Sequence, residues 1–177
     1  AGCARLVHVD ETSLMPMEKF CGACIDQDKL RSFDGRRASI CEFSRLAVDG
    51  AFRRRAGERA TRFGEINALD YSQRELRTFS LIAVSTILSA FAMSELIGRT
   101  NCFAMMEPFL TRLLLRSGII VHPAGHETDY HGMRAPYFFA AHETVGGMQP
   151  ELQEFYQAIL SSFRGPAAGT VSSAGRA

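Results

Sequence analysis

The chain has 177 residues, of which 46% are hydrophobic and 22% charged, and its formal net charge is +1 at pH 7. These values are typical of one ordinary globular domain, and they exclude an overall field that would attract nucleic acid or an anionic membrane. The five cysteines are odd in number and unevenly spaced, so they predict no disulfide framework and favour a reducing, cytoplasmic environment.

Two strands are predicted in the first part of the chain. Residues 5–9 form a short apolar run of strand type, and residues 39–49 form a second run that is rich in Ile, Phe, Leu and Val. Between them, residues 16–21 fit one helical turn with proline at its start, and Asp34-Gly35 is typical of a turn. Because the first strand begins almost at residue 1, we expect further residues of the fold to precede it.

A long helix is predicted in the middle of the chain. Residues 50–77 are polar and rich in arginine, which indicates a loop or short helical pieces. Residues 78–94 carry no charged side chain, but they are fewer than the roughly 20 that a membrane span needs and they include several serines and threonines. We therefore expect a helix that is buried against a sheet rather than a membrane span.

Three further strands and two further helices are predicted in the C-terminal half. The strands are expected at residues 102–106, 119–121 and 137–139, one helix between Pro108 and Gly118, and an amphipathic helix at residues 149–163. Residues 165–177 are mostly Gly, Ala and Ser, so we expect a disordered tail after a single domain at 1–164. A helix between two apolar strands indicates a βαβ unit, and the whole order predicts an α/β or α+β layered fold.

Three segments carry a resemblance to one family. Residues 2–6 (GCARL) resemble the glycine–arginine strand of the autoinducer synthases, and residues 41–48 (CEFSRLAV) resemble their Glu-x-Ser-Arg strand. Residues 106–119 and 129–137 resemble a narrower bacterial group, the N-acyl amino acid synthases associated with exosortase/PEP-CTERM systems. On these residues the chain resembles the GNAT acyltransferases that make acyl-homoserine lactones and N-acyl amino acids.

The resemblance implies a mixed sheet flanked by helices, apparently without its N-terminal part. Strands 40–48 and 101–106 would be adjacent, parallel and splayed at their C-terminal ends, with a pantetheine arm between them. The protein would be an N-acyltransferase that moves a fatty acyl group from an acyl carrier protein or coenzyme A thioester to the amine of an amino acid or related small molecule. The expected partners are therefore an acyl carrier protein and a small amine, with no nucleic acid and no permanently bound cofactor.

Two other interpretations stay open at this point. The chain could be a catalytically silent relative that binds a carrier protein or an acyl ligand. It could also be an unrelated α/β protein with a structural cluster of arginines. The part of the family fold that shapes the acceptor site has no counterpart in this sequence, so the sequence leaves the acceptor undetermined.

Glu42 and Arg45 are the predicted catalytic residues. Amide formation from a thioester needs a base for the amine proton and donors for the oxyanion, and the family motif places its glutamate at Glu42. Strict alternation would put Arg45 on the opposite face, so we expect a bulge that brings both side chains into one cleft. Arg5 and Ser44 are expected at the same substrate site. The competing interpretations are a solvent-edge glutamate and a structural ion pair.

The predicted donor site follows the second strand directly. Arg53, Arg54 and Arg55, with Gly57, lie where the family holds the pantetheine phosphate, although the usual glycine-rich loop is only half preserved. A basic run also suits the acidic surface of a carrier protein. A solvated charged loop is the alternative.

Phe103, Met105 and Met106 are candidates for an acyl tunnel, because methionine adapts to flexible chains. For any single one of these residues, a place in the hydrophobic core is the favoured interpretation.

No metal site is predicted. Cys21-Gly22-Ala23-Cys24 has the spacing of a redox or zinc motif, but there is no second cysteine pair to complete it. His122, His126 and His131 lie in a loop that contains glycine and proline, without a helical spacing that would fix them as ligands. His131 is expected to shape its turn rather than to take part in chemistry.

Overall fold

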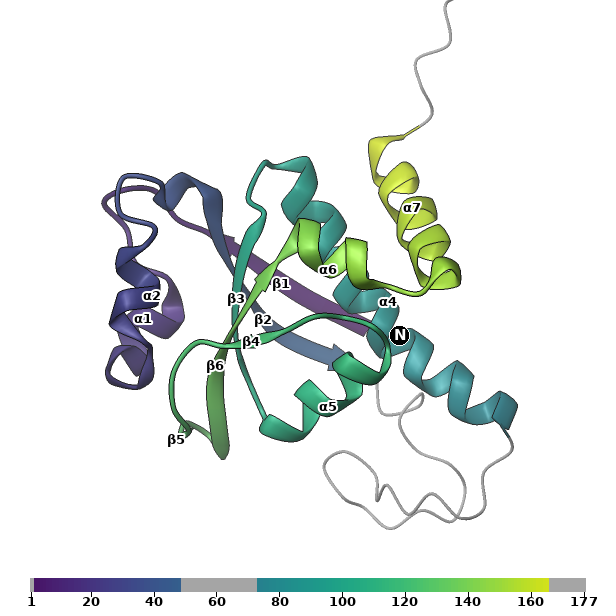
Figure 1. Ribbon diagram of the computed structural model, residues 1–177, viewed down its shortest axis with the longest axis horizontal. Coiled ribbons are helices and arrows are strands. Elements are labelled where there is room, and N and C mark those ends of the chain that lie inside the picture. The colour runs from purple at the N-terminus through teal and green to yellow at the C-terminus, as the bar shows by residue number, and fades with distance from the viewer. Residues whose placement is uncertain (1, 49–72, 166–177) are drawn as a thin grey trace, which may run out of the picture.

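A computed structural model describes residues 2–48 and 73–165, which form a six-stranded mixed sheet with helices on both faces (Figure 1). The strands are β1 (Gly2–His8), β2 (Ile40–Val48), β3 (Asn101–Met106), β4 (His122–Pro123), β5 (Thr128–Asp129) and β6 (Met133–Ala140). The helices are α1 (Pro16–Cys21), η1 (Gly22–Cys24), α2 (Gln27–Arg31), η2 (Arg37–Ser39), α4 (Gln73–Leu96), α5 (Pro108–Arg116), α6 (Ala141–Gly147) and α7 (Pro150–Arg164).

The sheet combines parallel and antiparallel pairs. Its order is β1-β2-β3-β6-β4, and β5 pairs with β6 beside this path. β2 and β3 are parallel, whereas β1–β2, β3–β6 and β4–β6 are antiparallel. The 52 residues between β2 and β3 include α4, so the connection is the βαβ crossover that the sequence predicts. The layered α/β fold expected from the sequence is confirmed.

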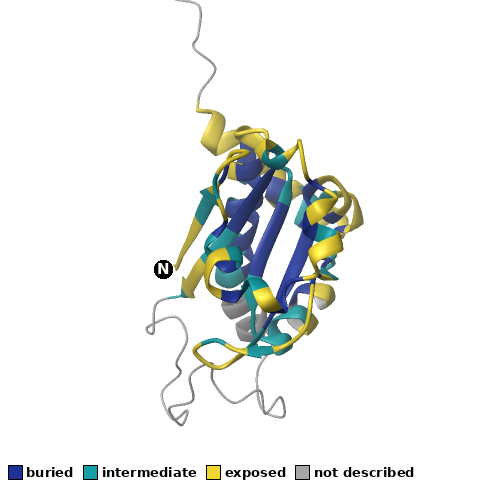
Figure 2. Ribbon diagram, turned by 90° about the vertical axis from the view of Figure 1, so that its left-hand side faces the viewer, coloured by how far each residue is buried: buried dark blue, intermediate teal, exposed yellow. Residues whose placement is uncertain are grey.

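The sheet separates two hydrophobic clusters. Figure 1 shows α1 and α2 on one side of the sheet and α4 and α7 on the other, and Figure 2 shows that the central strands are largely buried. Odd-numbered residues of β2 such as Cys41 and Phe43 face α4 and α7, whereas Ile40 faces the small layer of α1, η1 and α2. We call this small layer the α1–α2 layer. Because successive side chains of a strand point to opposite faces, Glu42 shares the α1–α2 face with Ile40.

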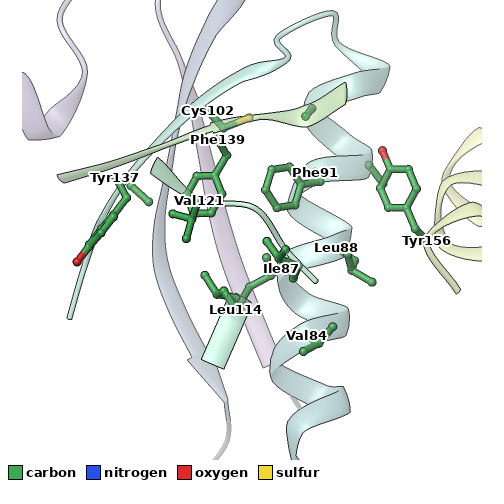
Figure 3. Packing of buried hydrophobic residues seen from close by; sticks show 14 of the residues in the cluster. Val84, Ile87, Leu88, Phe91, Cys102, Leu114, Val121, Tyr137, Phe139 and Tyr156 are labelled. Carbon is green, nitrogen blue, oxygen red and sulfur yellow. The ribbon is translucent and has the colours of Figure 1, made fainter. Parts of the chain in front are cut away.

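Helix α4 forms the larger cluster with α7 and the sheet (Figure 3). Its apolar residues recur at helical spacing, with Val84, Leu88 and Phe91 buried. Phe91 is completely buried and packs edge-to-face on Phe43 and Phe139, with ring centroids at 5.0 and 5.4 Å. The helix is therefore buried against the sheet, as predicted, and no helix in the described part of the chain is long and apolar enough to cross a membrane.

Two sequence predictions differ from the structure, two helices are not predicted, and one prediction falls on residues that are not described. Helix α4 begins at Gln73, so the expected loop at 50–77 is wrong for its last five residues, and residues 49–72 lie outside the described part. Residues 119–121 are not a strand, because Ile119 and Val121 are buried in the α4 cluster and pairing with β6 starts only at His122. The short helices α2 and α6 are not predicted. The expected tail lies outside the described residues, except for Gly165.

Candidate functional site

The two central parallel strands separate at their C-terminal ends. β2 and β3 pair from Ile40–Asn101 to Phe43–Ala104, and their ladder then stops, although β2 continues to Val48 and β3 to Met106. Figure 1 shows the two strands diverging beyond this point. On its other edge β2 remains paired with β1 as far as Val48. The predicted adjacent, parallel and splayed pair is therefore confirmed.

A bulge interrupts β2 just after the last pair with β3. Arg5 of β1 lies opposite Ser44 and Cys3 lies opposite Ala47, so two residues of β2 oppose a single residue of β1. One of these two is Arg45, whose φ of 53° is left-handed and uncommon for a side chain of this size. The strand therefore contains the expected bulge, which begins at Arg45 itself.

The bulge does not bring Arg45 to Glu42. Arg45 is exposed, whereas Glu42 retains only 4% of its accessible surface. Among the described residues, no hydrogen bond or ion pair joins the two side chains. The prediction that Glu42 and Arg45 point into one cleft is therefore wrong, because Arg45 is exposed at the bulge whereas Glu42 is buried.

Glu42 is a buried carboxylate beneath the α1–α2 layer. Its Oε2 accepts a hydrogen bond from the backbone N–H of Met17 at 2.8 Å. Burial raises its pKa from 4.5 to about 7, while the Met17 bond and the charge of Arg5 act in the opposite direction, and nearby Glu18 raises the pKa further. A carboxyl group with this pKa can exchange protons near neutral pH.

Arg5, and not Arg45, is the arginine on the Glu42 face of the sheet. Arg5 Nε donates to Ser44 Oγ at 3.0 Å, and the two residues are direct partners in the β1–β2 ladder. Ser44 lies two residues after Glu42, so Arg5, Ser44 and Glu42 share one face of the sheet. Three of the predicted site residues are thus brought together.

Cys21 and Arg134 interact electrostatically with this region, and sequence reasoning did not connect them with Glu42. Burial raises the pKa of the Cys21 thiol, the charges of Cys24 and Glu42 add to this effect, and the charge of Arg134 opposes it. Cys21 is therefore within electrostatic reach of both Glu42 and Arg134. The alternation of β6 could have placed Arg134 on the same face as Phe138, but only the tertiary fold brings this face to α1.

A pocket of about 210 Å³ adjoins the site between the α1–η1 segment and the β5–β6 hairpin. Its walls combine two aromatic rings, two thiols, small residues and a few polar groups. The lining residues are Lys19, Phe20, Cys21, Gly22, Ala23, Cys24, Thr128, Asp129 and Tyr130. Because Cys21 forms part of its wall, the pocket lies on the Glu42 side of the sheet.

The three candidates for an acyl tunnel do not share one environment. Phe103 is completely buried and packs on Phe33 and Phe138, with centroids at 5.8 and 5.2 Å, so it is a core residue. Met105 packs against the α1–α2 cluster and Met106 against the α4 cluster. The two methionines therefore lie on opposite faces of β3, in the segment that has separated from β2.

The predicted donor-site residues and the histidines remain to be placed. Arg53, Arg54, Arg55 and Gly57 lie outside the described residues. Within the described residues, no group of three or more His, Cys, Asp or Glu side chains could hold a metal ion. His122 Nε2 lies 3.0 Å from Glu143 Oε2, and His131 has a left-handed φ of 55° in its turn.

Comparisons with known proteins identify the fold. No protein-family profile and no curated protein matches the chain. The crystal structure of TofI in a ternary complex with an inhibitor and MTA is 15% identical, with a TM-score of 0.54 over 85% of this chain and 64% of TofI. The structure of MesI, a CoA-dependent acyl-homoserine lactone synthase, is 14% identical, with a TM-score of 0.52 over 90% of this chain and 63% of MesI.

These likenesses show that the chain has the fold of an acyl-homoserine lactone synthase, which is the GNAT-like fold expected from the sequence. The chain spans less than two thirds of the length of either protein.

Proposed function

We propose that this protein is an N-acyltransferase of the GNAT type. It moves a fatty acyl group from a thioester of an acyl carrier protein or coenzyme A to the amine of an amino acid or related small molecule. The observation that carries the proposal is the buried carboxylate of Glu42, with a pKa of about 7, one residue before the point where β2 and β3 separate. MesI, which has the same fold, is a CoA-dependent enzyme.

The chemistry requires a neutral amine, and Glu42 can supply it. In its ionised form Glu42 takes a proton from the acceptor ammonium group, directly or through one water. The amine nitrogen then attacks the thioester carbonyl and the carbon–sulfur bond breaks. The second proton of the nitrogen passes to the departing thiolate, which leaves as the thiol of the donor. Arg5 favours the ionised form of Glu42, and the Arg5–Ser44 bond holds the guanidinium on the same face.

The splayed strands offer a place for the donor arm. Beyond Phe43 and Ala104, the facing edges of β2 and β3 do not pair with each other. The backbone groups along these two edges could therefore bond an amide-containing chain. Pantetheine contains two amide groups and fits this requirement. Met105 and Met106 border the gap and are candidates for contact with the acyl chain.

The basic run Arg53–Arg55, with Gly57, follows β2 in the sequence and belongs to the same proposal. Its role would be to attract the acidic surface of a carrier protein or the phosphate of coenzyme A. Exchange of the three arginines for glutamate should slow donor association and weaken its dependence on salt. Association that is equally fast and equally salt-dependent in this variant would remove the run from the donor site.

Release of free thiol from acyl thioesters tests the activity of the full-length protein. With amino acids as acceptors, the rate should rise with pH with an apparent pKa near 7, because Glu42 must be ionised. Glu42→Gln should lower turnover by roughly 10²–10⁴ and abolish this pH dependence. Glu154→Gln, at an exposed glutamate on α7, is the matched control and should behave like the wild type.

Two outcomes would change the conclusion. If Glu42→Gln stays within a few-fold of the wild type with the same pH profile, then Glu42 has a structural role. If acyl thioesters bind but no amine releases thiol, the protein is a binding relative of the acyltransferases, which is the second interpretation left open by the sequence.

A further inference from the structure

Cys21 and Cys24 are two free cysteines that line the same pocket. They are 8% and 3% exposed, and both contribute to the wall of the cavity of about 210 Å³ between the α1–η1 segment and the β5–β6 hairpin. A molecule of liquid water occupies about 30 Å³, so this cavity has room for part of a small reagent beside the two cysteines. They therefore differ from cysteines that only fill the core, because a reagent can approach them.

The backbone between the two cysteines places them one turn apart. Helix α1 ends at Cys21, which is the N-cap of the 3₁₀-helix η1, and η1 ends at Cys24. A 3₁₀-helix has three residues per turn, so residues i and i+3 lie above each other, and a rise of about 2.0 Å per residue puts their Cα atoms about 6 Å apart. A disulfide spans Cα distances of ~4.4–6.8 Å. The pair therefore meets the main geometric requirement for a disulfide.

Two other uses of buried cysteine fit less well. Within residues 2–48 and 73–165, no third His, Cys, Asp or Glu side chain completes a metal site with this pair, and zinc takes four ligands. Another pair of thiols, Cys41 and Cys102, has its sulfur atoms 3.6 Å apart, but both residues are completely buried and neither lines the pocket. Cys21 and Cys24 thus combine proximity with access.

The surroundings of the two thiols favour a disulfide that persists once it has formed. Burial raises the pKa of both Cys21 and Cys24. The reduced pair therefore gains no stabilised thiolate, which is the feature that makes some disulfides strong oxidants. In a reducing compartment the dithiol is the resting form, and a disulfide forms only as a response to oxidation.

Cys24 is anchored to the segment between β4 and β5. Its carbonyl oxygen accepts a hydrogen bond from the backbone N–H of His126 at 2.9 Å. The neighbouring Gly125 approaches the same oxygen so closely that a Cβ at this position would clash with it. Cys24 therefore cannot move without this segment of the chain.

Cys21 belongs to the helix that covers Glu42. It is the last residue of α1, and the backbone N–H of Met17 in the same helix donates to Glu42 Oε2 at 2.8 Å. A covalent bond from Cys21 to the anchored Cys24 would hold the end of α1 in place. Such a bond would therefore oppose the exposure of Glu42 to water.

We propose that Cys21 and Cys24 form a reversible redox site, whose disulfide holds α1 over Glu42 and whose oxidant is a low-molecular-weight disulfide. With glutathione disulfide, the thiolate of Cys21, the more exposed of the two, attacks one sulfur atom and releases one glutathione. The thiolate of Cys24 then attacks Cys21 Sγ in the mixed disulfide and releases the second glutathione. Two electrons and two protons pass from the cysteine pair to the two glutathione thiols.

Alkylation and mass spectrometry of the full-length protein test the site. The protein is equilibrated with glutathione buffers of increasing oxidised fraction, alkylated, and cleaved with trypsin after Lys19 and Lys29, which leaves both cysteines in peptide 20–29. This peptide should lose both alkylation sites and become two hydrogen atoms lighter. The folded protein should form the disulfide on the order of tenfold more readily than a synthetic peptide 20–29, which must first close the four-residue loop.

Two serine variants complete this test. Cys24→Ser should stop at a mixed disulfide of Cys21 with glutathione, whereas Cys3→Ser, at an exposed cysteine, is the matched control and should behave like the wild type. Two free thiols in peptide 20–29 of the folded protein under every buffer would overturn the redox site. So would a disulfide that forms less readily in the folded protein than in the synthetic peptide.

Hydrogen exchange tests the link to Glu42 without an activity assay. The amide of Met17 should exchange on the order of tenfold more slowly in the oxidised protein than in the reduced one, and Cys24→Ser should show no such difference. Disulfide formation with unchanged exchange at Met17 would overturn the control of Glu42. Neither experiment depends on the proposed acyltransferase function, so both results would stand in a protein that transfers no acyl group.

Discussion

Replacement of Glu42 by glutamine should stabilise the protein above pH 7. The pKa of Glu42 rises from 4.5 to about 7 on folding, so the unfolded chain loses this proton first as the pH increases. The contribution of protonated Glu42 to the free energy of unfolding is fully present below pH 4.5. It is lost as the pH rises from 4.5 to about 7. Each pH unit of this difference is worth ~1.4 kcal/mol, so ionised Glu42 lowers the free energy of unfolding by about 3 kcal/mol.

Glutamine keeps the shape of the side chain and can still accept the hydrogen bond from Met17, but it does not ionise. The free energy of unfolding of Glu42→Gln, relative to the wild type, should therefore increase by about 3 kcal/mol between pH 4 and pH 8.5. This free-energy difference is measured by urea unfolding. Far-ultraviolet circular dichroism is the suitable signal, because the chain has no tryptophan to report unfolding by fluorescence. Glu154→Gln is the control for removal of an exposed charge. A difference that is constant with pH would refute the perturbed ionisation of Glu42.

Three further substitutions test the fold that holds the site. Phe91→Ala should lower the free energy of unfolding by about 3–5 kcal/mol in urea, because the ring is completely buried against two other rings. Gly125→Ala should prevent the β5–β6 hairpin from packing, because a Cβ there would lie 2.0 Å from the carbonyl oxygen of Cys24, and thermal melting should show a severe loss. Arg37→Met should cost roughly 3–5 kcal/mol by leaving the largely buried Glu18 carboxylate without its partner at 2.6 Å, whereas an unchanged melting temperature would show that this ion pair is irrelevant.

The elements that the sequence predicts best are those that must bury apolar surface on their own. α4 and β3 contain long apolar runs, and β2 carries apolar residues along most of its length, so the type of each element follows from the sequence. α2 is missed although Asp26 caps it by accepting from the N–H groups of Asp28 and Lys29. That capping signal was visible in the sequence. β4 could not be predicted, because its two residues are strand only through their pairing with β6.

The site was predictable only where the chain carries a local motif. The Glu-x-Ser-Arg motif of residues 41–48 predicts Glu42 and Ser44 as site residues. The glycine–arginine motif of residues 2–6 predicts Arg5. The position of Arg45 depends on where the bulge begins, which alternation alone does not determine. The charge of Arg134 lowers the pKa of Cys21 although more than a hundred residues of sequence separate the two, and no local pattern predicts this long-range interaction.

The layer that covers Glu42 is built from very short helices, with six residues in α1 and five in α2. Helices of this length are not stable in isolation, so the layer depends on its side-chain contacts with the sheet and can open without unfolding the rest of the protein. When the α1–α2 layer opens, Glu42 becomes exposed to water and its pKa returns to that of an ordinary carboxyl group. Between pH 4.5 and pH 7 the open population therefore grows by up to about tenfold for each pH unit. Helix α1 of this layer also lines the pocket. Ionisation of Glu42 and opening of the pocket are therefore thermodynamically coupled.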